Sequence, residues 1–180
     1  MPGDFTRDKF LDNASDDIGE FVRSVPLPHG ATINAVGHSY GSTALAKATL
    51  DHAIEWDNPV GAGSPGMVAE HAADFGADDV VMVAQRGDPI TGVGAAGTGA
   101  ADVLDVILPV LIPGDAFLDS ESVGVPDEGR WGDPYDSDFG ARQKGSYAPF
   151  TPPNFDRHSE YFLEDVGQLE TIANVTTDQK

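Results

Sequence analysis

One serine of this sequence lies in a setting that would expose it as a nucleophile. Ser39 is the central residue of the segment GHSYG at positions 37–41, which matches the pattern G-x-S-x-G. That pattern forces a sharp turn between a strand and a helix, and its glycines leave room for a strained serine backbone. A serine hydroxyl attacks carbonyl carbon only when a base takes its proton. The segment therefore predicts acyl-transfer chemistry, provided that a base and an acid lie nearby.

The residue after this serine is expected to serve the same reaction. The backbone N–H of Tyr40 would point from the start of the following helix toward the substrate, where it can donate to the developing oxyanion. The competing interpretation is a glycine-rich turn in which Ser39 has no chemical role.

Histidine is the residue type that limits the choice of a base. The chain has five of them, and proteins with this serine turn order the three groups as serine, then acid, then histidine. Only His158 follows a plausible acid, so it is the predicted general base. The alternative for His158 is an ordinary histidine in a surface loop. The other four are His29, His38, His52 and His71.

Asp88 is the predicted acid, which would orient the imidazole of His158. It follows the apolar segment 79–84, and Pro89 fixes the turn after it. The alternative is an Asp-Pro turn residue without a catalytic role. Further acids lie in a region where no strand precedes them: Asp133, Asp136, Asp138 and Asp156.

The segments around these residues alternate between helical and strand patterns. This alternation predicts an α/β fold with a parallel sheet between helices on both faces. Ligands of such sheets bind at the carboxyl ends of the strands, so Ser39 and Asp88 should share one edge. The expected helices are 5–25, 42–56 and 67–75, and the expected strands are 31–36, 59–62 and 79–84.

The remainder of the chain is expected to complete one domain over 1–180. Residues 114–156 show little periodicity, so we expect a lid or long covering loop there, whose aromatic residues either line an acyl pocket or anchor the loop. Helices are expected at 102–111 and 160–173, on either side of that loop. The aromatic residues are Phe117, Trp131, Tyr135, Phe139, Tyr147, Phe150 and Phe155.

Composition and short sequence patterns argue against several kinds of partner and ligand. The formal net charge of −20 disfavours nucleic acid and anionic membranes. The longest apolar stretch, 103–113, is too short to span a bilayer, and the first residues do not read as a signal peptide. The acidic segment 115–138 lacks the spacing of a calcium loop, and the chain has no cysteine. We expect neither a metal nor a cofactor.

A dinucleotide-binding domain is a further alternative for an alternating α/β sequence. Residues 92–97 match G-x-G-x-x-G, but a turn separates them from the preceding strand. The pattern therefore lacks the context that a phosphate-binding turn requires.

Four motifs together resemble a known family. GHSYGS at 37–42, GSPG at 63–66, FGA at 139–141 and HSEYF at 158–162 occur in this order. The chain thereby resembles an actinobacterial α/β-hydrolase family of unknown function, similar in outline to cutinases and esterases. The resemblance implies an α/β-hydrolase fold and a triad of Ser39, Asp88 and His158, but no reaction more specific than hydrolysis. As the substrate we expect a small-molecule or lipid-like ester.

The resemblance also implies one missing part. Such hydrolases have a strand before their first helix, and the loop after that strand supplies a second oxyanion donor. Here the first helix begins almost at Met1. We therefore expect either a shortened remnant or a sheet completed by the rest of a longer chain or by a partner. The alternative function is a weak or inactive hydrolase-fold domain that serves as a binding or scaffold module.

Overall fold

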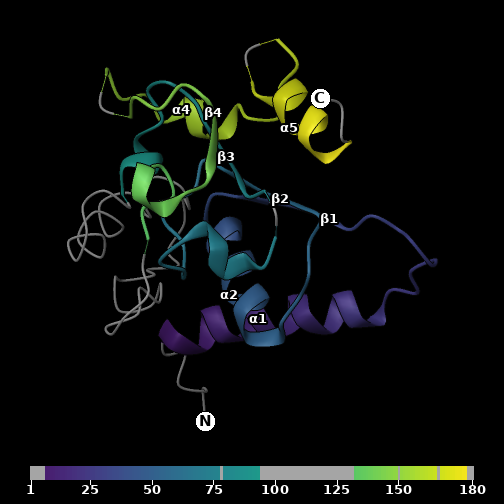
Figure 1. Ribbon diagram of the computed structural model, residues 1–180. Helices are drawn as coiled ribbons and strands as arrows, with labels where there is room; N and C mark the ends of the chain where they lie inside the picture. The colour runs from purple at the N-terminus through teal and green to yellow at the C-terminus, as the bar shows by residue number, and fades with distance from the viewer. Residues whose placement is uncertain (1–6, 78, 94–131, 150, 166, 178–180) are drawn as a thin grey trace.

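The computed structural model describes residues 7–77, 79–93, 132–149, 151–165 and 167–177 (Figure 1). Four strands and four α-helices, connected by short 3-10 turns, make up this part of the chain. The strands are β1 Asn34–His38, β2 Asn58–Ala62, β3 Val81–Ala84 and β4 Arg142–Gly145. The α-helices are α1 Arg7–Ser24, α2 Tyr40–His52, α4 Asp156–Ser159 and α5 Leu169–Thr176. The 3-10 turns are η1 Ala72–Phe75, η2 Pro89–Gly92 and η5 Ser137–Phe139.

The four strands form one parallel sheet in the order β1-β2-β3-β4. Helices α1 and α2 lie on one face of this sheet and α5 lies on the other, which gives the three layers predicted from the sequence (Figure 1). The register pairs Val36 with Val60 and Val60 with Val81. Since all strands run the same way, their carboxyl ends lie together at one end of the sheet.

Two of the apolar core clusters lie on opposite faces of the sheet, because strand β3 presents alternate residues to its two faces. Met82 and Ala84 pack with Ala46 of α2 on one face. Val81 and Val83 pack with Ile172 of α5 on the other. All four residues of β3 are at most 1% exposed. Such two-sided burial explains the continuous apolar run in the sequence.

Polar contacts fix the packing of α1 against α2. The hydroxyl of Ser15, which is fully buried, donates to Asp51 over 2.7 Å. Lys47 of α2 forms ion pairs with Asp51 at 2.8 Å and with Asp12 of α1 at 3.0 Å. These contacts tie the first helix to the helix that follows the serine turn.

Two expected helices are shorter than the sequence pattern indicated. In segment 67–75 only η1 is helical, because Met67 exchanges backbone hydrogen bonds with Gly132 and so lies in a bridge. In segment 160–173 the helix begins only at Leu169. The preceding turn is held by hydrogen bonds from Gly167 N to Leu163 O and from Gln168 N to Tyr161 O.

The segment 114–156, which shows little periodicity in the sequence, nevertheless contains regular structure in its described part. Residues 142–145 form β4, the edge strand of the sheet, and η5 precedes it. Tyr135 and Phe139 are 4% and 3% exposed and belong to a core cluster, which favours the interpretation that they anchor this segment on the core. The expected helix 102–111, the stretch 114–131 with Phe117 and Trp131, and also Phe150, lie outside the described residues.

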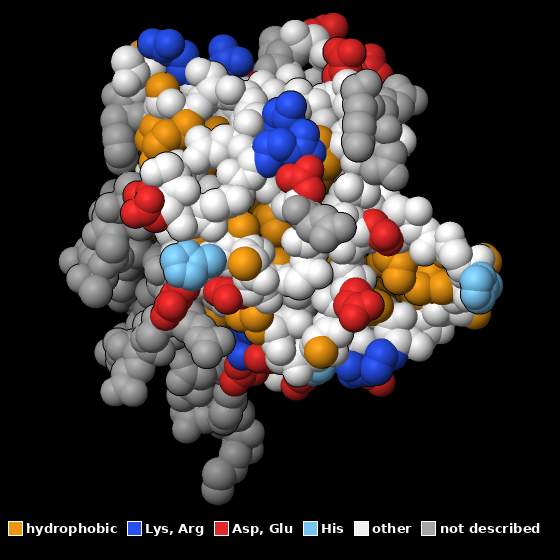
Figure 2. Space-filling view, viewed as in Figure 1, with side chains coloured by type: hydrophobic (Ala, Val, Ile, Leu, Met, Phe, Trp, Pro, Cys, Tyr) orange, Lys and Arg blue, Asp and Glu red, His pale blue; other side chains and the backbone are white. Residues whose placement is uncertain are grey.

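The surface is acidic without forming one acidic patch on the face in view. Acidic side chains are scattered there among apolar and basic ones (Figure 2). Within the described ranges, no helix is both long and apolar enough to cross a membrane.

Candidate active site

Ser39 has the backbone conformation of a strained turn. Its φ of 54° and ψ of −134° are rare for a residue with a side chain, and such strain is usual at functional sites. The Ser39 N–H donates to Ala62 O of β2 over 2.9 Å, and its carbonyl accepts from Ser42 N of α2. A Cβ atom at Gly37 would lie 2.5 Å from Ser42 Cα, so the close crossing of strand and helix requires glycine there.

The three residues predicted from the sequence form one chain of hydrogen bonds. His158 Nε2 lies 2.7 Å from Ser39 Oγ, and His158 Nδ1 lies 3.0 Å from Asp88 Oδ2. An ionised carboxylate only accepts, so Nδ1 carries the proton when Asp88 is charged. Nε2 is then the free acceptor for the Ser39 hydroxyl. This is the arrangement in which a neutral imidazole can take the proton of a serine.

Asp88 is held in place by its own turn. It precedes η2, and its Oδ1 accepts a hydrogen bond from Ile90 N over 2.9 Å. Pro89 begins that turn, as the sequence indicated. The Asp88 side chain is fully buried, so it depends on these partners for the solvation that water would otherwise supply.

Tyr161 is a further contact of Asp88 that sequence reasoning did not assign to the site. Its hydroxyl donates to Asp88 Oδ2 over 2.8 Å and accepts from Gln85 N over 3.0 Å. Burial, and to a lesser degree the neighbouring Tyr135 and Asp88, raises the pKa of Tyr161 far above its usual range. The phenol therefore stays protonated and remains a donor. The HSEYF motif was the available signal, because it places this tyrosine three residues after His158.

His38 is a second residue of the site that sequence reasoning missed, and it contacts His158. Its position before the serine disfavours a role as the general base, yet its ring stacks on that of His158 with centroids 4.8 Å apart. His38 Nε2 lies 2.7 Å from the backbone oxygen of His158. Burial, followed by the charge of protonated His158, lowers the pKa of His38 below 6.5, and these effects outweigh the opposing hydrogen bond and Asp88 charge.

A buried polar network lies beneath the serine turn. The Ser42 hydroxyl hydrogen-bonds the Ser39 carbonyl at 2.6 Å and the Ser64 hydroxyl at 2.7 Å. Ser64 N donates to the Tyr135 hydroxyl, which in turn donates to Val83 O. The GSPG segment thus joins β2 to the turn, and this explains its small and polar residues.

The competing acids make local contacts instead. Asp133 accepts from Tyr135 N, and Asp136 accepts from Asp138 N. Asp138 and Asp156 are exposed. In the part of the chain that the structure describes, no group of three acidic or histidine side chains is placed to hold a metal ion.

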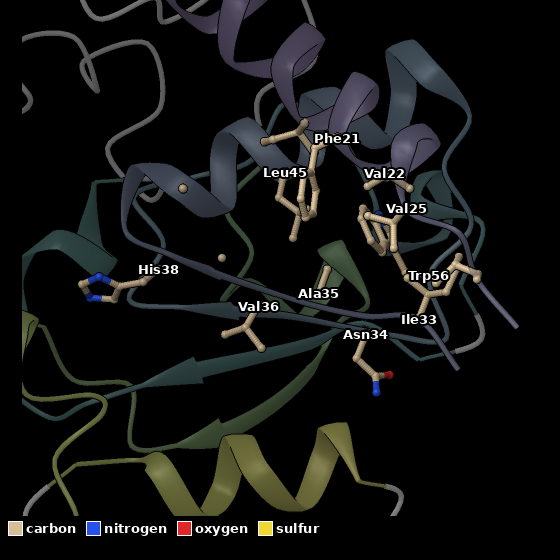
Figure 3. Close-up of a pocket in the computed structure, with 14 residues that line it drawn as sticks. Phe21, Val22, Val25, Ile33, Asn34, Ala35, Val36, His38, Leu45 and Trp56 are labelled. Carbon is tan, nitrogen blue, oxygen red and sulfur yellow. The ribbon is translucent and has the colours of Figure 1, made fainter. Parts of the chain in front are cut away.

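An apolar groove of about 450 Å³ runs along β1 and ends beside the serine turn (Figure 3). Phe21 and Val22 of α1, Val25 just after that helix, and Leu45 of α2 line it above the strand. Figure 3 shows Ala35 on the helix side and Val36 on the opposite side of β1. Val36 and Phe21 are 42% and 68% exposed. Residues on both faces of β1 therefore line the groove, so the groove runs along the outer edge of this strand.

A comparison with known protein families identifies a family whose fold agrees with the one described above. The alpha/beta hydrolase family profile matches residues 4–97, slightly more than half of the chain. The protein therefore belongs to the alpha/beta hydrolase family. The match includes Ser39 and Asp88 but ends before His158, so the position of His158 is an independent observation. Searches of curated proteins and of solved structures gave no match.

Proposed function

We propose that this protein is a serine hydrolase that acts on esters through Ser39, His158 and Asp88. The observation that carries the proposal is the position of His158, whose Nε2 lies 2.7 Å from Ser39 Oγ while Nδ1 contacts Asp88. The strained backbone of Ser39 at the end of a parallel strand supports the same assignment. The proposed substrates are small or lipid-like esters, in keeping with the acyl-transfer chemistry of an activated serine.

Each residue has a defined step in this reaction. Ser39 Oγ attacks the ester carbonyl while its proton moves to His158 Nε2, and Asp88 stabilises the resulting imidazolium. The Tyr40 N–H, at the start of α2, donates to the oxyanion of the tetrahedral intermediate. His158 then returns the proton to the leaving alcohol. Water, activated by the same histidine, releases the acid and frees Ser39.

Covalent labelling with a fluorophosphonate probe tests this proposal. We expect labelling of the wild type at Ser39 and none of Ser39→Ala, with His158→Ala at least about 10³-fold slower. Ser137→Ala and His29→Ala are matched controls, because both residues lie at exposed positions and should label like the wild type. A folded wild-type chain that stays unlabelled would overturn the proposal and favour a binding module.

We also propose that the edge of β1 receives an additional strand, from the rest of a longer chain or from a partner. Ser39 N donates to Ala62 O and Asp57 N donates to Ile33 O, so odd-numbered residues of this segment face β2. The backbone groups of successive strand residues point to opposite sides of the strand. Those of Val36 and His38 therefore point away from β2 and toward the groove. An extended peptide would satisfy these groups and cover the apolar lining. It would also bring a loop near Ser39 that can supply a second oxyanion donor.

Hydrogen exchange tests the open edge directly. In the isolated chain, the amides of Val36 and His38 should exchange faster than those of Ala35 and Gly37, which face β2. A longer chain or a complex that fills the edge should slow exchange at Val36 and His38 and raise the rate of ester hydrolysis. Equal protection of both sets in the isolated chain would contradict the proposal.

A further inference from the structure

His38 contacts the proposed general base at two points. Its Nε2 lies 2.7 Å from the backbone oxygen of His158, and the two imidazole rings stack at 4.8 Å with 30° between their planes. A carbonyl oxygen can only accept, so His38 Nε2 carries a proton and donates it. The neutral form of His38 is therefore fixed as the tautomer with an unprotonated Nδ1.

The element that carries His158 needs such support. Helix α4 comprises only four residues, and the N-terminal side-chain contact it makes is a hydrogen bond from Asp156 N to Asn154 Oδ1 over 3.0 Å. A single helical turn is only marginally stable by itself, because nucleation costs more than one hydrogen bond returns. The His158 carbonyl lies in the last turn, where backbone oxygens lack helical partners. The His38 donor supplies that missing partner.

We propose that His38 is a positioning residue that holds the imidazole of His158 in line with Ser39. This inference rests on the proposed function. Because His38 and Ser39 are adjacent, the same strand end binds the backbone of His158 through one residue and its Nε2 through the next. A displacement of His158 would break both contacts together. The rings of Tyr161 and Phe162 also contact the His38 ring, with centroid distances of 5.4 Å and 5.6 Å.

The charge of His38 also suits this role. During acyl transfer His158 becomes a cation, and a second cation stacked on it would oppose the transfer. Burial and the charge of His158 both disfavour protonation of His38, although Asp88 nearby favours it. Near neutral pH, His38 is therefore a neutral donor that supports the His158 cation without repelling it.

Three substitutions at position 38 separate the hydrogen bond from the ring. His38→Gln keeps an N–H donor at similar reach, His38→Phe keeps the ring alone, and His38→Ala keeps neither. With p-nitrophenyl acetate we expect kcat to fall about 10²-fold in the Phe and Ala variants, with KM within about twofold, because displacement of a catalytic group slows the chemical step. The Gln variant should recover kcat to within about fivefold of the wild type.

A second histidine offers a matched control. His71 is exposed and makes the same kind of contact, in which a ring nitrogen lies 3.1 Å from the backbone oxygen of Asp138. His71→Phe removes that contact, which involves none of the three proposed catalytic residues, and should leave kcat unchanged. A His38→Phe variant that is equally active, or a Gln variant as slow as the Ala variant, would overturn the positioning role.

A spectroscopic measurement keeps this inference separate from the proposed function. The proton on His158 Nδ1, which bonds to Asp88, should give a low-field NMR signal that His158→Ala removes. We expect this signal in the wild type and in His38→Gln, and its loss or broadening in His38→Phe and His38→Ala. An unchanged signal in the Phe and Ala variants would refute the positioning role. A wild type that shows the signal but neither hydrolyses esters nor labels would refute only the hydrolase proposal.

Discussion

Tyr161 and Asp88 are joined by a 2.8 Å hydrogen bond in which the phenol donates to Oδ2, the same oxygen that lies 3.0 Å from His158 Nδ1. Both side chains are fully buried. One oxygen of the carboxylate thus has two donors, and the other oxygen accepts from Ile90 N. The orientation of the imidazole therefore depends on a residue that never contacts the serine.

Removal of the phenol hydroxyl should weaken both the fold and the site. Tyr161→Phe leaves Gln85 N without its acceptor and Asp88 Oδ2 without one donor, which should cost about 1–3 kcal/mol of unfolding free energy. Urea unfolding measures this loss, and ester hydrolysis should slow in parallel. Tyr147→Phe is the control, because Tyr147 is 38% exposed and should change stability by less than about 0.5 kcal/mol.

Replacement of Ser39 by glycine should stabilise the protein while it abolishes hydrolysis. Glycine adopts a positive φ without steric cost, so Ser39→Gly should relieve about 1–3 kcal/mol of backbone strain. Ser39→Ala removes the same hydroxyl but keeps a Cβ atom, so it should be equally inactive without that gain. Thermal unfolding of the two variants compares them. Equal Tm values would show that the turn is not strained.

Gly63 should tolerate no side chain. Its φ is +58°, and a Cβ atom there would lie 2.8 Å from the Tyr161 ring and 3.1 Å from Asp88 Oδ2. Gly63→Ala should therefore cost about 2–4 kcal/mol, through the backbone conformation and through overpacking. Gly30→Ala isolates the first contribution, since Gly30 has a φ of +77° with open space around it. Equal costs at the two positions would contradict the close approach.

The pH dependence of stability should reveal the neutral state of His38. Its folded pKa lies below 6.5, so the unfolded chain binds the proton more readily. Stability from this residue is present above pH 6.5 and is lost as pH falls toward the lowered folded value. The stability of the wild type relative to His38→Gln should therefore decrease below pH 6.5. A constant difference between pH 5 and 8, measured by urea unfolding, would contradict this prediction.

The parts of the site that sequence reasoning placed correctly follow strand ends. Ser39 and Asp88 come directly after β1 and shortly after β3, and parallel strands bring their carboxyl ends together. His158 was predicted by order and elimination, and it lies within hydrogen-bonding distance of both. Their catalytic roles are proposals.

The misses arise from contacts between distant segments. Strand β4 has the sequence Arg-Gln-Lys-Gly with four exposed residues, and its only strand signal is its pairing with β3. The segment around Met67 has a helical pattern, but a bridge to Gly132 removes its first residues from a helix. His38 and Tyr161 belong to the site because the fold brings each against a residue 120 or 73 positions away.

The two edges of the sheet differ in how they resist aggregation. Strand β4 carries Arg142 and Lys144 at its exposed edge, and charged side chains discourage pairing with another sheet. Strand β1 instead presents Val36 beside an apolar groove. Among the described strands, the β1 edge is therefore better suited than the β4 edge to pair with a further strand. A charged residue in place of Val36 would discourage strand pairing at the β1 edge as well, so that both outer strands carried charge.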